Sequence, residues 1–142
     1  MLTSVNHTSF TVSDLARSVA FYRDVLGMKL EFETETSGDF IRTVTAFPDA
    51  HIKVAVLSLG NHRLELIQYL APKGTVLDLR TCNVGAPHLA FWCDDIQKTY
   101  QELQGKGVSF KSAPMRSDVS GNWACYFTDP DGIALELNLR PA

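Results

Sequence analysis

Two histidines and two glutamates of this sequence occur in matching local settings. His7 precedes the run "TSFTVSDL" and His88 opens the run "HLAFWCDDI", while Glu65 and Glu136 each lie between leucines in a "LEL" triplet. Imidazole nitrogens and carboxylate oxygens together suit a divalent transition metal such as Co, Ni, Zn, Mn or Fe. With water in the remaining positions, these four side chains predict an octahedral site that leaves two adjacent positions for a substrate's oxygens.

A less specific interpretation of the same residues is that each histidine bonds to a backbone group and each glutamate faces solvent. For a lone histidine in a strand that interpretation is the more common one. Here the same residue types recur at matching places in both halves of the chain, and the leucines beside each glutamate must face the opposite side of its strand. The repetition favours the metal site.

The repeat extends beyond these four residues. Shifting the chain against itself by 81 positions aligns His88 with His7 and Asp95 with Asp14, and a shift of 71 positions aligns Leu135–Leu137 with Leu64–Leu66. A single shift cannot do both, because the second half is shorter between its helix and its last strand. The sequence therefore indicates an internal duplication.

Each half starts with an alternating strand pattern and then changes to helical spacing. In the first half, residues 4–12 alternate, Asp14 is a suitable N-cap, and Gly27 stands where a helix would end. Four strand-like runs follow, with a Gly60-Asn61 hairpin signal between the last two. These runs are "MKLEFETE", "FIRTVTAF", "IKVAVLSLG" and "HRLELIQYL".

The second half repeats the strand, the aspartate cap, a helix in "QKTYQELQGKG" and the strands "VSFKS", "WACYFTDP" and "GIALELNL". We predict an α+β fold of two tandem βαβββ modules that form a curved mixed sheet around the metal site. Module one covers about 1–70, the connection about 71–84 and module two about 85–142, within a single domain. The loop from Ala113 to Asn122 is expected to be a mobile segment that covers the substrate.

Composition argues against several function classes. The 142 residues carry a net charge of -3, which provides no basic field for nucleic acid or an anionic membrane. No apolar run approaches the ~20 residues of a membrane span, and "MLTSVNHTSF" lacks the features of a signal peptide. Three cysteines without CxxC spacing fit a reducing compartment, so we expect a cytoplasmic protein.

Four motifs that span the chain resemble those of the vicinal oxygen chelate superfamily, which includes glyoxalase I, methylmalonyl-CoA epimerase, extradiol dioxygenases and the fosfomycin and bleomycin resistance proteins. The opening motif is "H-x-x-F-T-V-x-D-L-x-x-S-x-x-F-Y-x-x-V-L-G" and the closing one is "D-P-D-G-x-x-x-E-L". Between them lie "G-x-x-x-L-E-L" and "H-L-A-F-x-x-D-D-I". The resemblance implies paired βαβββ modules around a metal, and a homodimer.

The ligand set narrows the activity that this resemblance implies. Extradiol dioxygenases and fosfomycin-modifying enzymes have a second histidine where this chain has Glu65, which argues against oxygen activation. Bleomycin-binding relatives lack the ligands altogether. The segments around Glu65 and His88 resemble methylmalonyl-CoA epimerases, although those commonly have an amide at the position of Glu65, which leaves the substrate open.

We therefore expect a divalent-metal-dependent isomerase or lyase that removes a proton α to a carbonyl through a metal-bound enediolate, in the manner of methylmalonyl-CoA epimerase. Glu136 is the favoured base, and Glu65 would supply the second acid or base that epimerisation needs. The alternatives are a lactoylglutathione lyase like glyoxalase I and a non-catalytic ligand-binding or resistance protein. The expected substrate is a small molecule, an acyl-CoA or a glutathione adduct.

Overall fold

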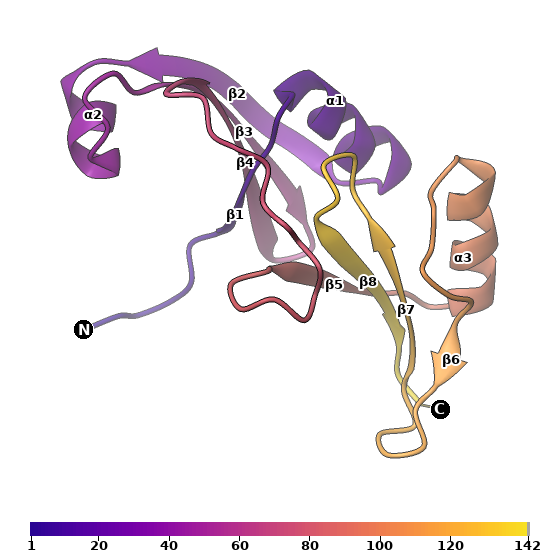
Figure 1. Cartoon of the computed structure of the whole chain (residues 1–142). Coiled ribbons are helices and arrows are strands. Elements are labelled where there is room, and N and C mark those ends of the chain that lie inside the picture. Colours follow the sequence, from indigo (N-terminus) through magenta and orange to yellow (C-terminus); the bar gives the residue numbers. More distant parts are fainter. Residues whose placement is uncertain (142) are drawn as a thin grey trace. The chain divides into compact units, whose positions relative to one another are not determined.

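The computed structural model describes residues 1–141, which divide into two compact units at residues 76 and 77. The first unit contains four strands, β1 (Thr8–Thr11), β2 (Lys29–Ser37), β3 (His51–Leu59) and β4 (His62–Ala71). Its helices are α1 (Leu15–Ala20), which continues as the π-helical turn η1 (Phe21–Val25), and α2 (Asp39–Thr45). The strands form one sheet in the order β1-β4-β3-β2, in which β1 is parallel to β4 and the other pairs are antiparallel (Figure 1).

The second unit has the same strand topology, and its last three strands are shorter than their counterparts in the first unit. Its strands are β5 (His88–Trp92), β6 (Met115–Arg116), β7 (Trp123–Thr128) and β8 (Ala134–Leu139), with α3 (Ile96–Gly105) after β5. The sheet order is β5-β8-β7-β6, and β5 is parallel to β8. The predicted α+β fold of two tandem βαβββ modules is confirmed, with one four-stranded sheet in each module.

The first helix of each module begins with the same aspartate cap. Asp14 accepts a hydrogen bond from the Arg17 backbone N–H at 3.0 Å, and Asp95 accepts one from the Lys98 N–H at 3.0 Å. The two caps share almost the same extended backbone, with φ/ψ of -143°/108° and -141°/104°. An extended cap whose side chain satisfies a free N–H of the first turn is the usual way to turn a strand into a helix.

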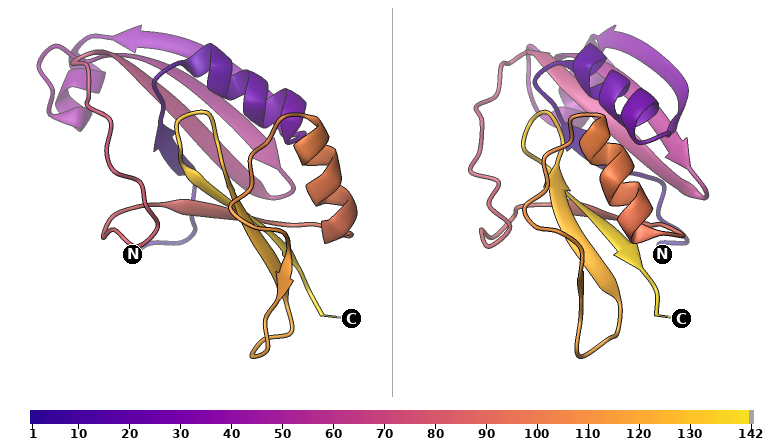
Figure 2. Two further views of the ribbon diagram at one scale, coloured as in Figure 1. Left: turned by 45° about the vertical axis from the view of Figure 1, so that its right-hand side comes forward. Right: turned by 90° about the vertical axis from the view of Figure 1, so that its right-hand side faces the viewer.

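The two faces of the first sheet are divided by strand alternation on β4. Leu64 and Leu66 are fully buried, and Gln68 accepts a hydrogen bond from the Leu15 backbone N–H at 3.0 Å, so these alternate residues face α1. Glu65 lies between the two leucines and therefore projects from the other face. Figure 2 shows α1 lying across the sheet of its unit. Burial of the leucines under α1 is what fixes the direction of the carboxylate.

The Glu65 side of the first sheet carries a second apolar cluster, toward the α2 end. The partly buried side chains of Ile67 and Tyr69, both on β4, pack against this cluster. The rings of Tyr69 and Phe47 meet edge to face at a centroid distance of 5.9 Å. Helix α2 contributes Ile41 to this cluster. The buried members are Ile41, Ala50, Ile52, Val54 and Val56.

Helix α2 corrects one prediction, because "FIRTVTAF" was expected to be a strand. Its β-branched residues resemble a strand, but Phe40, Val44 and Phe47 are also spaced by four and three residues, as on one side of a helix. The helix places Ile41 against the sheet and leaves Phe40 and Val44 exposed. Tertiary burial of one residue thus decided the structure of a segment with ambiguous periodicity.

The edge of the second sheet corrects another prediction. The segment "VSFKS" forms an isolated bridge between Phe110 and Phe127, not a strand of its own. The short strand β6 falls instead inside 113–122, which was expected to be a loop, where Met115 pairs with Ala124. An edge strand with one neighbour has few ladder bonds, so its position is weakly specified by the sequence.

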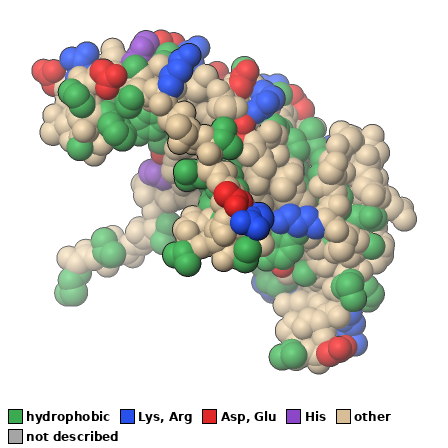
Figure 3. Space-filling view, in the orientation of Figure 1, with side chains coloured by type: hydrophobic (Ala, Val, Ile, Leu, Met, Phe, Trp, Pro, Cys, Tyr) green, Lys and Arg blue, Asp and Glu red, His purple; other side chains and the backbone are tan. Residues whose placement is uncertain are grey.

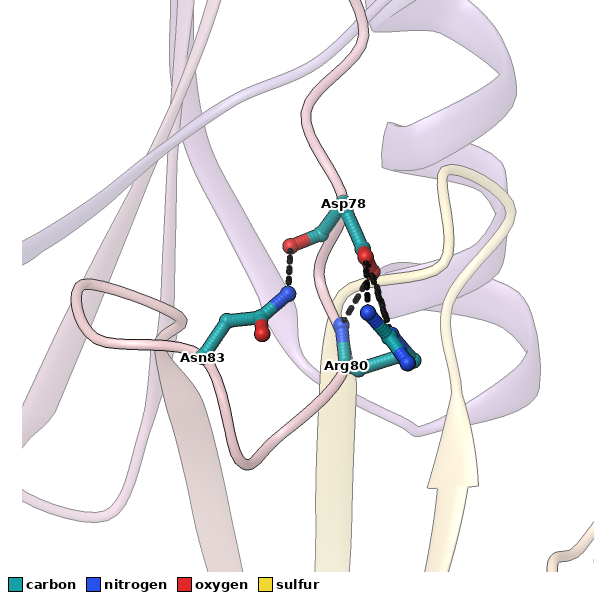
Figure 4. Close-up of polar contacts among 3 residues, drawn as sticks. All are labelled: Asp78, Arg80 and Asn83. Carbon is teal, nitrogen blue, oxygen red and sulfur yellow. Dashed lines mark hydrogen bonds and ion pairs between the residues drawn. The ribbon is translucent and has the colours of Figure 1, made fainter.

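The connecting segment after β4 is organised by short-range polar contacts. Asp78 accepts hydrogen bonds from the Arg80 guanidinium and backbone N–H, and its backbone carbonyl accepts one from the Asn83 amide at 3.0 Å (Figure 4). The Arg80 side chain is the main reason that the pKa of Asp78 lies below its usual value. These exposed contacts order the segment locally.

Charged side chains of both signs are interspersed over the visible surface, and hydrophobic side chains gather over α2 (Figure 3). No helix among residues 1–141 is both long and apolar enough to cross a membrane.

Candidate metal centre

His7 and Glu65 lie together in the first unit. Nε2 of His7 is 3.3 Å from Oε1 of Glu65, and the side chains are 37% and 21% exposed. His7 directly precedes β1, and Glu65 lies on the neighbouring strand β4, opposite Ser9. Parallel pairing of β1 with β4 therefore brings together two side chains that are 58 positions apart in the sequence.

Asn6 orients the His7 ring. Oδ1 of Asn6 lies 2.6 Å from Nδ1 of His7. An amide oxygen can only accept, so this contact is a hydrogen bond in the tautomer that carries its proton on Nδ1, and that tautomer has its lone pair on Nε2, the atom nearest Glu65. Metal-binding histidines are generally held by such a bond from the second ring nitrogen to a carbonyl or carboxylate oxygen. Sequence reasoning did not select Asn6, although its position next to His7 was the available signal.

His88 and Glu136 form the corresponding pair in the second unit. Nε2 of His88 is 3.7 Å from Oε2 of Glu136, and the carboxylate is 14% exposed. His88 is the first residue of β5, and Glu136 lies opposite Ala90 on β8.

The two pairs have the same strand register. In both units the glutamate faces the residue two positions after the histidine, Ser9 in one case and Ala90 in the other. Each strand pair thus places one imidazole and one carboxylate on the same face, because residues two apart share a face. The duplication inferred from the sequence is therefore visible in the positions of all four predicted ligands.

The spacing within each pair fits two donors of one metal ion. Donor atoms about 2.1 Å from an ion lie about 3.0 Å apart at a right angle and about 3.4 Å apart at a tetrahedral angle. The observed 3.3 Å and 3.7 Å are close to these separations and are longer than a good N–H···O hydrogen bond. Within either unit, no three His, Cys, Asp or Glu side chains of residues 1–141 gather at one point, so each unit offers two donors.

Tyr126 extends the pair in the second unit. It lies opposite Glu136 on β7, so the two side chains project from the same face of the sheet. Burial first, and then the charge of Glu136, raise the pKa of Tyr126, so the phenol is protonated at neutral pH. Its ring also meets His88, at a centroid distance of 5.8 Å and an angle of 66°. The place of Tyr126 beside Glu136 depends on the register of β7 with β8, which is a finding of the structure.

The remaining candidates lie outside these pairs. Nε2 of His51 lies 2.7 Å from Oε1 of the exposed Glu35. Nε2 of His62 is buried and has no hydrogen-bond partner among residues 1–141. Burial raises the pKa of Cys93 and raises that of Cys125 to about 11, so both are thiols at neutral pH.

Residues 4–137 match the family model of the glyoxalase/bleomycin resistance protein/dioxygenase superfamily. The chain belongs to this superfamily. Its fold agrees with a crystal structure of a glyoxalase family protein from Bacillus cereus, with a TM-score of 0.84 at 24% identity over 100% of this chain and 97% of that one.

Relatives in the glyoxalase superfamily carry different activities. A 2-epi-5-epi-valiolone epimerase from Actinomyces sp. is 31% identical over 98% of this chain and 80% of its own length. A metallothiol transferase FosB from Staphylococcus epidermidis is also 31% identical, over 96% of this chain and 82% of its own length. The mitochondrial methylmalonyl-CoA epimerase of Mus musculus is 25% identical over 94% of this chain and 71% of its own length. Overall identity therefore does not separate epimerisation from thiol transfer.

Proposed function

We propose that this protein is a divalent-metal-dependent isomerase or lyase that removes a proton α to a carbonyl group. His7, Glu65, His88 and Glu136 would together hold one Co, Ni, Zn, Mn or Fe ion. The proposal is carried by one observation, the same register and similar spacing of the two histidine–glutamate pairs. Since each unit offers two donors, a complete site needs a pair from each kind of module, within one chain or shared by two chains of a homodimer.

The bound ion would stabilise the negative charge that develops on oxygen when the substrate loses its proton. The protein's own side chains have the other tasks. A carboxylate, Glu65 or Glu136, takes the proton from carbon, and Asn6 keeps Nε2 of His7 available as a donor. Returning the proton to the opposite face would give an epimer, and returning it to the neighbouring carbon would give a glyoxalase-type product.

The carboxylate of Glu65 favours this chemistry over that of the FosB relatives. The fosfomycin-modifying branch, like the extradiol dioxygenases, has a histidine at this position, whereas a carboxylate there supplies a second group that can accept a proton. Two relatives named as epimerases support the same choice. We infer that the substrate is a small carbonyl compound, an acyl-CoA as in methylmalonyl-CoA epimerase or, as the alternative, a glutathione adduct as in glyoxalase I.

The three cysteines are free, as in proteins of a reducing compartment, and we place this protein in the cytoplasm.

Metal-dependent hydrogen exchange tests the proposal. The protein is incubated in D2O with Co²⁺ and a panel of short-chain acyl-CoA thioesters and glutathione adducts of 2-oxoaldehydes, and deuterium at the α carbon is followed by NMR. We expect incorporation into a member of the panel that stops on chelation and resumes when Co²⁺ is restored. Tight Co²⁺ binding without exchange on any member would instead favour the alternative of a non-catalytic binding protein.

A further inference from the structure

The row of residues that leads away from Glu65 across the first sheet is apolar. Glu65 lies opposite Val56 on β3, and Val56 lies opposite Phe32 on β2. Directly opposed residues project from the same face of a sheet. Val56 is buried and Phe32 is 46% exposed, so neither side chain offers a charge or a hydrogen bond beside this glutamate.

The matching row of the second sheet ends in a cation. Glu136 lies opposite Tyr126 on β7, and the Lys111 backbone N–H donates to the Tyr126 carbonyl at 2.8 Å. The residue before it, Phe110, forms a bridge with Phe127, and its ring packs on that fully buried ring at a centroid distance of 5.1 Å. Neighbouring residues of an extended chain project to opposite faces, so the packing of Phe110 turns Lys111 to the face of Glu136.

The Lys111 side chain extends toward the histidine–glutamate pair. Its Nζ lies 5.9 Å from the centre of the Tyr126 ring, and the same ring meets the His88 ring at a centroid distance of 5.8 Å. The backbones of Lys111 and Glu136 are separated by two strand spacings, roughly 10 Å. Among residues 1–141, no Asp or Glu side chain forms an ion pair with Lys111.

The charges at this position favour an anion. A divalent ion held by the carboxylates of Glu65 and Glu136 is neutral together with its protein ligands, so Lys111 adds a net positive charge beside them. An ammonium group has three donors, and the face of a ring attracts its charge without supplying an oxygen acceptor. The donors of Lys111 can therefore bind an anionic oxygen while the ammonium stays over Tyr126.

We propose that Lys111 is a specificity-determining residue that binds an anionic group of the substrate, a carboxylate or a phosphate, close to the reacting carbon. The substrate then carries a charge on its reacting part and not only on a carrier such as coenzyme A or glutathione. An uncharged substituent would lie beside Glu65, where the row of Val56 and Phe32 is apolar. This assignment rests on the proposed function and deepens it by naming the class of substrate.

Hydroxamates test the assignment without turnover, because they chelate a metal ion through two adjacent oxygens, as the proposed substrate does. The monohydroxamates of succinic and adipic acid end in a carboxylate, whereas butyrohydroxamate and hexanohydroxamate have a methyl group at the same place. Phosphonopropionohydroxamate replaces the carboxylate by a phosphonate. Dissociation constants are measured on the Co²⁺-loaded protein from the visible spectrum of the ion.

Two lysine variants are compared with the native chain. Lys111→Met keeps a long side chain and removes the charge. The matched control is Lys98→Met on α3, which makes the same change at a lysine whose Nζ lies 3.9 Å from Glu102. Helix α3 packs Tyr100 on Phe110 at a ring-centroid distance of 4.6 Å, and therefore lies on the face opposite Lys111.

We expect the native protein to bind a charged probe at least about 10-fold more tightly than the methyl probe of the same length, the gain from a hydrogen bond between charged groups. Lys111→Met should lose this preference and bind Co²⁺ and the methyl probes as the native chain does. Lys98→Met should keep the preference. Tighter binding of the phosphonate than of the carboxylates would identify a phosphorylated substrate, and the reverse order a carboxylic acid.

Equal affinity of the native protein for charged and methyl probes, or a preference that survives in Lys111→Met, would overturn the role of Lys111 while leaving the proposed metal site in place. A native chain that binds no divalent ion would instead remove the proposed function together with this assignment.

Discussion

Replacing Glu65 by glutamine is expected to slow α-proton exchange by about 10²- to 10⁴-fold, the usual contribution of a general base. Glutamine keeps an oxygen that can still approach a metal ion, but it cannot accept a proton at neutral pH. Co²⁺ should therefore remain bound to Glu65→Gln while exchange is lost. Deuterium incorporation and Co²⁺ affinity are measured on the same preparation.

The matched control is Glu35→Gln, an exposed glutamate whose neutralisation affects only His51 and Lys53 among its described ion-pair partners. It should exchange at the native rate. Full exchange in Glu65→Gln, with exchange lost in Glu136→Gln at unchanged Co²⁺ affinity, would assign the base to Glu136 and contradict a proton-accepting role for Glu65.

Replacing Leu66 by alanine should lower the free energy of unfolding by about 2–5 kcal/mol, as expected for truncation of a fully buried leucine. Leu66 is fully buried on the α1 side of β4, where it lies opposite Phe10 on one side and Ala55 on the other. The effect is a large part of the roughly 5–15 kcal/mol that stabilises an ordinary domain. Urea unfolding followed by circular dichroism measures it.

The control for Leu66→Ala is Val44→Ala on α2, whose side chain is 61% exposed. That change should alter the free energy of unfolding by less than about 0.5 kcal/mol. Equal losses in the two variants would mean that the α1 side of the sheet is not the principal core of its unit. Such a result would also weaken the argument that buried leucines fix the direction of Glu65.

The repeat and the residues that begin each helix could be predicted because they act locally. Asp14 and Asp95 cap their helices through an N–H three positions away, so the signal lies within a few residues of sequence. The pairing of His7 with Glu65 is not local, yet it was inferred because a second copy, His88 with Glu136, showed the same two residue types on strands at the same places. The internal duplication therefore indicated a long-range pairing that a single copy of the module would not have revealed.

Features that depend on a tertiary partner could not be predicted. Helix α2 forms because it buries Ile41 in the cluster with Val54 and Val56. The alternation in "FIRTVTAF" does not reveal this burial. Tyr126 lies opposite Glu136 only through the register between β7 and β8. Predicting the inserted helix or the cross-strand neighbour requires knowing which residues meet across the sheet.

Metal content of the purified protein tests the central claim most directly. Elemental analysis is carried out on the native chain, on His88→Ala, on Glu136→Ala and on His51→Ala, whose histidine pairs with Glu35 away from both candidate pairs. We expect about one divalent ion per chain in the native protein and in His51→Ala, and loss of that ion in the other two variants. A native protein free of divalent metal, or His88→Ala with its full metal content, would contradict the metal site and with it the proposed chemistry.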